Sequence, residues 1–364
     1  MIAFAPTEEQ ETARDAMRSF AEQAMRPMAR ECDEAAAIPD SFFAQAWELG
    51  LTSTQIPEAY GGFGAERSPI TNAIILEELA YGDAALSIAA VAPSLFAYAV
   101  LDFGTTDQKT KHLPLFCGPQ YHAAAVAVAE PWPRFDPLRP HAVATRKGRA
   151  FVLSGTKCLV PMGDRASHYL VAARSDDGLD AFFVARDVAG LSVSAPEKNL
   201  GLHALPTATL ELRDVEVAET DRLGGSGRAD VERLLNHSRV ALGAIMTGLS
   251  RAALDYCVPY AKERVAFDEP IARKQSIAFR LAEMHIETEC TRWLVWKAAS
   301  QLERGHDATR SAHFARAYAA EKSMWIADNA VQVLGGHGFI REHPVEMWYR
   351  NARTLGVLEG MACV

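Results

Sequence analysis

The chain lacks the sequence signatures of metal-bound, disulfide-bonded and membrane-spanning proteins. Its six cysteines form no Cys-x-x-Cys pair and no His stands at a zinc-like spacing, so we expect neither a zinc site nor a disulfide framework. Residues 1–6 turn polar at once, which is atypical of a signal peptide. We also expect no apolar run near the roughly 20 residues that span a bilayer. These absences predict a cytoplasmic protein without a bound metal or a membrane span.

Positive charge is also in short supply. The chain has 37 Lys and Arg residues against 46 Asp and Glu residues, a formal net charge of −9. Nucleic-acid binders usually carry a basic face, so this balance argues against a nucleic-acid partner. No Gly-rich phosphate loop follows a predicted strand, which argues against a nicotinamide-binding fold. What is present is an ordinary globular composition, 49% apolar over 364 residues, enough for two or three domains.

The first predicted domain, residues 1–118, is helical. Thr7 with Gln10, and Thr105 with Gln108, have the spacing of a capping box at a helix start. Apolar residues recur at helical spacing after the first of these caps. Gly50 is a predicted helix stop. Helices therefore account for most of this region.

The second predicted domain, residues 119–222, changes from a helical to a strand period. Short apolar or alternating runs are separated by turn residues such as Lys147-Gly148 and Asp177-Gly178. This pattern predicts an antiparallel β-barrel or sandwich. The predicted strands cover residues 123–129, 141–146, 150–153, 169–173, 181–185 and 208–212.

The third predicted domain, residues 223–364, returns to long helices. One apolar stripe continues from Leu235 to Tyr256 for about six turns, another begins at Ile277, and a third helix covers residues 313–334 and stops at Gly335. Long helices with short connections predict an antiparallel four-helix bundle. The predicted fold class is α+β, with a helical domain, a β-domain and a helical bundle in that order.

Several motifs share an order and a spacing that resemble the acyl-CoA dehydrogenase family over essentially the whole chain. They are Pro-Glu-Ala-Tyr-Gly-Gly at residues 57–62, Glu-Glu-Leu-Ala-Tyr-Gly-Asp at 77–83, Tyr-Ala-Lys-Glu-Arg-Val-Ala-Phe at 260–267 and Gln-Val-Leu-Gly-Gly-His-Gly-Phe at 332–339. The resemblance implies a flavoenzyme that binds FAD and oxidises an acyl-CoA thioester between its α and β carbons. It also implies an electron-transfer flavoprotein as acceptor in most members, or oxygen in the oxidases.

The resemblance places the catalytic base at Glu359. Family members use a carboxylate near the C-terminus to remove the α proton while the β hydride moves to the flavin, and Glu359 falls at that position. Its apolar neighbours Val357, Leu358 and Met361 fit a desolvated carboxylate. The alternative is an exposed Glu in a fraying tail.

Some members place the base just before a buried Arg of the first bundle helix instead. That Arg corresponds to Arg239 here, and Ser238 before it cannot act as a carboxylate base. The resemblance also implies that Arg239 and Leu358 border the substrate. The family's last helix is expected to be missing after Glu359, since the sequence stops at Val364 and has Met361 and Cys363 where the family has Thr and Gln.

The bundle half of the family's flavin site is present in the sequence. Arg264 and Phe267 match an Arg-x-x-Phe that reaches the flavin from a neighbouring subunit, where the guanidinium pairs with the pyrophosphate. Asp268 replaces the Gly that usually follows. The other matching residues are Gln275, Gln332, Gly335 and Gly336, of which the two glycines leave room for the adenosine part.

The β-domain half departs from the family. Where the family has Thr-Glu-Pro and then Gly-Ser-Asp, this chain has Ala129-Glu130-Pro131 after Val128, and Phe135 replaces the Ser near the thioester. Where the family has Trp-Ile-Thr against the flavin ring, the chain has Leu159-Val160-Pro161. Two donors near the ring are therefore missing, each worth about 1 kcal/mol.

Three interpretations remain open from the sequence. The first is an acyl-CoA dehydrogenase-like flavoenzyme that forms a homo-oligomer. The second is one subunit of a hetero-oligomer in which two different chains complete the flavin site. The third is a flavin-free relative that binds an acyl-CoA or an acyl-carrier partner. The weak β-domain half motivates the last two, while retention of Glu359 argues against the third.

Overall fold

The computed structural model describes residues 5–364, so residues 1–4 of the predicted non-signal N-terminus lie outside the described residues. Most of residues 8–116 are helical. Both predicted capping boxes are confirmed. The hydroxyls of Thr7 and Thr105 accept from the backbone N–H of Gln10 and Gln108, respectively, and the side-chain oxygen of each glutamine accepts from the backbone N–H of its threonine. The helices are α1 (Glu8–Phe20), a π-helical turn (Ala21–Met25), α2 (Arg26–Ala35), α3 (Asp40–Glu48), α4 (Pro69–Gly82), α5 (Ala84–Phe103) and α6 (Thr106–His112).

Helix α5 corrects one expectation from the sequence. Its 20 residues have the length and apolar composition of a membrane-crossing helix, with a mean hydropathy of 2.0 over its most apolar window. In the structure, 94% of that window is buried inside the protein. The helix packs between the N-terminal helices, the start of α7 and the first strand, where its apolar surface forms part of the core. A helix apolar on all sides is typical of such a buried position.

A single seven-stranded sheet follows. The strands are β1 (Ala124–Ala127), β2 (Val143–Lys147), β3 (Ala150–Pro161), β4 (His168–Ser175), β5 (Gly178–Ala185), β6 (Leu191–Val193) and β7 (Thr207–Ala218). Their order is β1-β4-β2-β3-β7-β6, with β5 paired to β4. The sequence predicted an antiparallel β-domain, but the sheet is mixed. Strands β1 and β4 pair in parallel, from Ala124↔His168 to Ala127↔Val171. The long connection between these strands permits a parallel pair.

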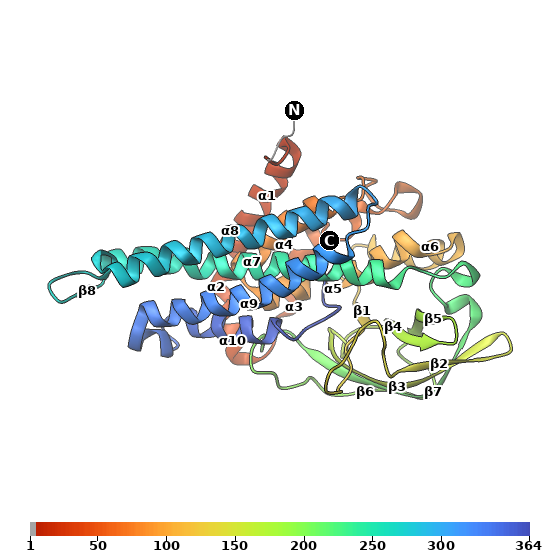
Figure 1. The fold of residues 1–364 in the computed structure, drawn as a ribbon. Coiled ribbons are helices and arrows are strands. Elements are labelled where there is room, and N and C mark those ends of the chain that lie inside the picture. The colour runs from red at the N-terminus through yellow and green to blue at the C-terminus, as the bar shows by residue number, and fades with distance from the viewer. Residues whose placement is uncertain (1–4) are drawn as a thin grey trace.

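The last part of the chain is a helical bundle. It consists of α7 (Val231–Glu263), α8 (Gln275–Glu303), α9 (Thr309–Leu334) and α10 (Val345–Leu355). A short hairpin of β8 (Val265–Ala266) and β9 (Glu269–Pro270) joins α7 to α8. In Figure 1 this hairpin projects at one end of the bundle, whereas the seven-stranded sheet lies under the opposite end. The two ends of the bundle therefore have different neighbours.

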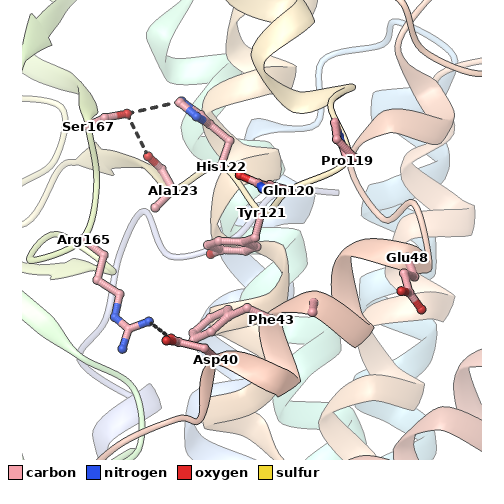
Figure 2. Close-up of a pocket in the computed structure, with 11 residues that line it drawn as sticks. Asp40, Phe43, Glu48, Pro119, Gln120, Tyr121, His122, Ala123, Arg165 and Ser167 are labelled. Carbon is pink, nitrogen blue, oxygen red and sulfur yellow. Dashed lines mark hydrogen bonds and ion pairs between the residues drawn. The ribbon is translucent and has the colours of Figure 1, made fainter.

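A cleft of about 580 Å³ lies where α3 meets the segment that leads into β1 (Figure 2). At its rim, Arg165 donates to Asp40 at 2.8 Å. Also lining the cleft, the Ser167 hydroxyl lies 3.3 Å from the ring nitrogen Nε2 of His122. Its walls come from α3, the segment before β1 and the loop before β4, so the cleft lies where the N-terminal helices meet the loops of the β-domain.

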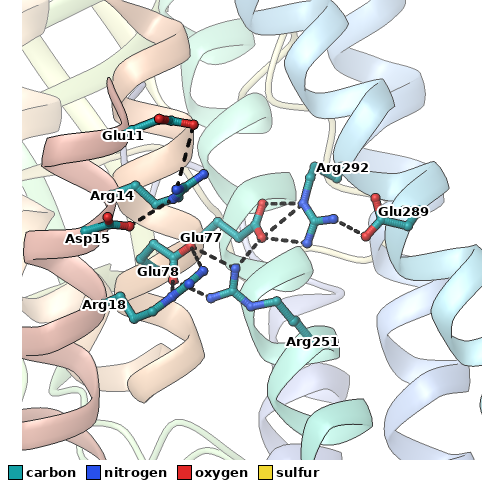
Figure 3. A network of polar contacts seen from close by, with 9 residues as sticks. All are labelled: Glu11, Arg14, Asp15, Arg18, Glu77, Glu78, Arg251, Glu289 and Arg292. Carbon is teal, nitrogen blue, oxygen red and sulfur yellow. Dashed lines mark hydrogen bonds and ion pairs between the residues drawn. The ribbon is translucent and has the colours of Figure 1, made fainter. Parts of the chain in front are cut away.

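The N-terminal helices are joined to the bundle by a buried charge network (Figure 3). Arg251 of α7 donates to Glu77 at 2.9 Å and to Glu78, and Arg292 of α8 donates to Glu77 at 2.8 Å. Near this point α4 and α7 cross closely, since a Cβ added to Gly248 would lie 2.1 Å from the Glu77 carbonyl oxygen. Both carboxylates belong to the motif at residues 77–83. Truncating one partner of such a network leaves a buried charge unpaired.

Candidate active site

Glu359 lies in the segment that leaves α10 and returns to the protein interior. Its side chain is 21% exposed, and its Oε2 atom lies 4.0 Å from Nε of Arg239. Oε2 is buried and has no hydrogen-bond partner among residues 5–364. Leu358 and Met361 on either side are buried, whereas Val357 is exposed and contributes nothing to an apolar environment. The carboxylate is thus partly enclosed, beside one cation, with one oxygen free to accept a proton.

Arg239 lies on the buried face of α7, as its place in the apolar stripe predicted. Its Nη1 donates to the side-chain oxygen of Asn236, three residues earlier, at 3.2 Å. Its Nε faces Glu359 instead. The neighbouring Ser238 is also buried and its hydroxyl has no partner within the described chain. The helix therefore presents a cation to the carboxylate and no second carboxylate at position 238.

Arg316 is a further charged residue beside this segment, and sequence reasoning missed it. It lies on α9 and donates to three main-chain carbonyls, those of Leu355 at 3.0 Å, Gly356 at 3.2 Å and Leu358 at 2.8 Å. Burial lowers the pKa of its guanidinium below the usual range. A signal existed in the sequence, because Arg316 interrupts an alanine stripe of the predicted helix at residues 313–334.

The segment that carries Glu359 packs directly against the end of β1. Gly360 has a φ of +71°, and a Cβ added there would lie 2.6 Å from Cγ2 of Val128. Such a left-handed backbone beside a close contact favours glycine strongly. The predicted base and the predicted flavin-side position Val128 are therefore brought together, although 231 residues separate Val128 from Glu359.

The two predicted β-segments lie side by side. The backbone N–H of Cys158 donates to the Ala129 carbonyl at 2.9 Å. The fully buried ammonium of Lys157, on the second of these segments, donates to the Val128 carbonyl at 3.1 Å and to Glu130 Oε1 at 2.8 Å on the first. The Glu130 carboxylate also accepts the N–H groups of residues 141 and 142. A buried ion pair with further hydrogen bonds fixes the register of both segments.

Lys157 is the second functional-region residue that sequence reasoning missed. It continues the inward-facing alternation of Phe151 and Leu153 along β3. A lysine at an inward position of a strand needs a buried partner. That rule gave a usable signal for the pair, but it did not identify Glu130 as the partner.

The remaining β-side positions offer few donors. Leu159 adopts a φ of +53°, and its N–H donates to the Glu197 carboxylate at 3.1 Å. Pro161 is buried at the end of β3 and has no N–H, and Ala129 has no hydroxyl. Phe135 is partly buried and packs against the core cluster that contains Val128. These positions form an apolar wall rather than a set of hydrogen-bond donors.

The predicted flavin-binding residues of the helical bundle lie away from Glu359 and the β-segments. Phe267 and Asp268 form the two central residues of the β8–β9 hairpin, with φ values of +57° and +65°. Two positive φ values are typical of a type I′ turn, and Asp adopts the conformation that glycine would favour. Phe267 is 89% exposed, and Arg264 and Gln275 are also exposed. Figure 1 places this hairpin at the end of the bundle away from the seven-stranded sheet.

The predicted flavin-binding residues Gln332, Gly335 and Gly336 also lie away from the β-segments. All three are exposed at the end of α9, and a Cβ added to either glycine would meet no atom within 4 Å. Gln332 borders a cleft of about 410 Å³ that also includes Tyr349. Within one chain, the structure thus groups Glu359, Arg239 and the β-segments, and keeps the bundle-end residues apart from them. None of the predicted site residues lines the cleft of Figure 2.

Comparison with known proteins identifies the group to which the chain belongs. Three family models match in order: the N-terminal domain of acyl-CoA dehydrogenases over residues 7–118, the middle domain over 125–215 and the C-terminal domain over 225–362. A protein named acyl-CoA dehydrogenase from Bacillus subtilis is 32% identical over 97% of this chain and 95% of its own length. The chain belongs to the acyl-CoA dehydrogenase family.

Other relatives agree with this assignment. The 3-(aryl)acrylate reductase of Clostridium sporogenes is 32% identical over 97% of this chain and 95% of its own length. The structure of butyryl-CoA dehydrogenase from Megasphaera elsdenii superimposes with a TM-score of 0.89 at 30% identity, and covers 99% of this chain and 96% of that one. The predicted fold class is confirmed, and the chain is a member of a family of flavin-dependent oxidoreductases.

The predicted flavin-binding residues differ in how well they suit a flavin: those at the bundle end suit it better than those on the β side. At the bundle end, Arg264 is an exposed cation suited to a pyrophosphate, and the open space around Gly335 and Gly336 allows a close approach. At the β side, Pro161 lacks a donor and the Leu159 N–H is already bound to Glu197. The chemistry of the bundle end is thus compatible with FAD, while the β side offers apolar surface without replacing the missing donors.

Proposed function

We propose that the chain catalyses the α,β-dehydrogenation of an acyl thioester, with Glu359 as the base that removes the α proton. The observation that carries this proposal is the buried, unpaired Oε2 of Glu359 beside Arg239. A carboxylate oxygen that is shielded from water and free of donors can take a proton from carbon. Leu358, Phe135 and Val128 supply the apolar surface nearby that excludes water from the reacting thioester.

Arg239 holds the carboxylate in this proposal. Its guanidinium is oriented by Asn236 and faces Glu359, so the base keeps a fixed direction before the substrate arrives. Preorganised charges of this kind need not rearrange during the reaction. Bound FAD would supply the hydride acceptor at the β carbon, and electrons would then leave to an electron-transfer flavoprotein.

The proposed FAD site requires two chains. The separation of Arg264, Phe267 and Gln275 from the β-segments supports a site in which one chain contributes the bundle end and its partner contributes the β side. Helix α8 also exposes Phe279, Ile286 and Trp293 at intervals of seven residues. This spacing places them on one helical face, as in helices that pack against another helix. A homo-oligomer would cover that face and complete the site.

Replacing Glu359 by Gln tests the base. The purified wild-type chain is mixed anaerobically with a panel of straight-chain and aryl-substituted acyl-CoA thioesters, since one relative is named a 3-(aryl)acrylate reductase. We expect loss of the oxidised flavin absorbance in the wild type. In Glu359→Gln the bleaching rate should fall by about 10²- to 10⁴-fold, while the bound flavin remains, because the amide cannot accept the proton.

Glu342→Gln is the matched control, since Glu342 is exposed in the segment before α10, and its rate should equal that of the wild type. Full activity in Glu359→Gln would refute the base assignment. A chain that is colourless alone but yellow with a co-expressed relative would favour the hetero-oligomer instead. A chain that is colourless in every combination would favour the flavin-free binder and overturn the enzymatic proposal.

A further inference from the structure

Arg316 occupies an apolar position of α9. The nearby alanines of the same helix face, Ala312, Ala315 and Ala319, are fully buried, and Arg316 itself is only 7% exposed. Removing a guanidinium from water is costly unless its N–H groups find acceptors. Its placement here therefore requires specific partners, and those partners identify what the side chain does.

The partners of Arg316 all belong to the segment that precedes Glu359. Nη2 donates to the carbonyls of Leu355 and Gly356, where α10 ends, and to the carbonyl of Leu358. The Leu358 carbonyl belongs to the same planar peptide unit as the N–H of Glu359. A donor fixed on that oxygen therefore limits how the peptide unit, and with it the Cα of Glu359, can rotate.

Charge reinforces this geometry. The last carbonyls of α10 carry partial negative charge, which favours a cation there. No carboxylate within residues 5–364 lies at ion-pair distance from Arg316. The charged groups that act on it electrostatically are the carboxylate of Glu359 and the guanidinium of Arg239. Arg316 is thus a buried cation that is hydrogen-bonded to the main-chain turn before Glu359 and adds positive charge near the proposed base.

We propose that Arg316 is a positioning residue for Glu359. It joins the end of α10 to the Glu359 peptide and holds the carboxylate at the distance from Arg239 that the structure shows. This inference rests on the proposed function, because it gives Arg316 its role through Glu359. It concerns only residues of this chain and requires no contact between Arg316 and the substrate.

Three variants test the proposal in the flavin-loaded protein. Arg316→Met keeps an unbranched apolar stem and removes every donor. Arg316→Lys keeps the charge with a point donor in place of the planar fork. Arg310→Met is the matched control, since it makes the same change at an exposed position of the same helix. Each is assayed for kcat and KM with the acyl-CoA that bleaches the wild type fastest.

We expect Arg316→Met to lower kcat by about 10- to 100-fold with KM within about twofold, because small displacements of a catalytic group cost that much. Arg316→Lys should recover part of the loss, and Arg310→Met should match the wild type. An unchanged kcat in Arg316→Met, or a raised KM with unchanged kcat, would overturn the proposal. If Arg316→Met does not fold, the kcat of Arg316→Lys decides in the same way.

Hydrogen exchange supplies a readout that needs no substrate. The N–H groups of Gly356, Val357 and Leu358 donate to carbonyls of α10 in the same turn. Arg316→Met should accelerate their exchange, measured by mass spectrometry on a peptide spanning residues 355–364, and Arg310→Met should not. Unchanged exchange would refute the Arg316 contact, whereas full activity of Glu359→Gln would refute only the base, so the two failures are distinguishable.

Discussion

His112, at the end of α6, makes the stability of the fold sensitive to acid. Its ring stacks on Phe183 with centroids 4.4 Å apart and meets the ring of Phe96 edge-on at 5.7 Å. The side chain is buried, and neither ring nitrogen has a hydrogen-bond partner in the described part of the chain. Burial, with smaller contributions from Lys111 and His168, lowers the pKa of His112 to about 4.

The sign of the effect follows from this lowered pKa. Above the ordinary value of about 6.5 the imidazole is neutral in both states, and its packing contributes fully to stability. As the pH falls below 6.5, His112 becomes protonated in the unfolded chain but stays neutral in the folded chain. The free energy of unfolding therefore decreases until the pH reaches about 4, where the folded chain also binds the proton. With 1.36 kcal/mol per pKa unit, the loss between pH 7 and pH 5 is about 2 kcal/mol.

The test is His112→Phe, which keeps an aromatic ring between Phe96 and Phe183 and removes the titration. The free energy of unfolding is measured by urea denaturation at pH 7 and pH 5. We expect the variant to lose about 2 kcal/mol less than the wild type over this interval. Some dependence should remain, because burial also lowers the pKa of His237 to about 3.

His306→Phe serves as the control, since His306 is exposed near the turn between α8 and α9. Its pH dependence should equal that of the wild type. The reasoning would be refuted if His112→Phe and the wild type lost the same free energy between pH 7 and pH 5. In that case His112 would be able to gain a proton in the folded protein at little cost.

Two further predictions concern the contacts that hold the site. Lys157→Met should lower the free energy of unfolding by about 3–5 kcal/mol in urea denaturation, because it leaves the Glu130 carboxylate buried without its cation. Adding Glu130→Gln should restore part of this loss, and a loss below about 1 kcal/mol in the single variant would contradict a buried pair. Gly360→Ala should cost about 1–3 kcal/mol and slow flavin bleaching, because the new Cβ would overlap Val128. Gly118→Ala, where an added Cβ meets nothing within 4 Å, should leave both measurements unchanged, and a neutral Gly360→Ala would contradict the close contact.

The sequence by itself determined the order and type of the elements. The caps at Thr7 and Thr105, the strand alternation that includes Phe151, and the α7 stripe are interactions between near neighbours in the chain. Their signals therefore survive in a single sequence. The motif at residues 332–339 is likewise a local pattern, so the family resemblance could be seen before any contact was known, and that resemblance implied the position of Glu359.

Only the tertiary structure decided the partners. Lys157 and Glu130 are 27 residues apart, and Arg316 is 42 residues from the Leu358 carbonyl that it contacts. The parallel pairing of β1 with β4 and the burial of His112 also depend on distant segments. The period of apolar residues along an element can indicate that a charged residue in that pattern will be buried. It does not indicate the residue's ion-pair or hydrogen-bond partner, which depends on how distant segments pack together. For this reason the resemblance could indicate the position of the proposed base, and only the fold shows which distant residues lie beside it.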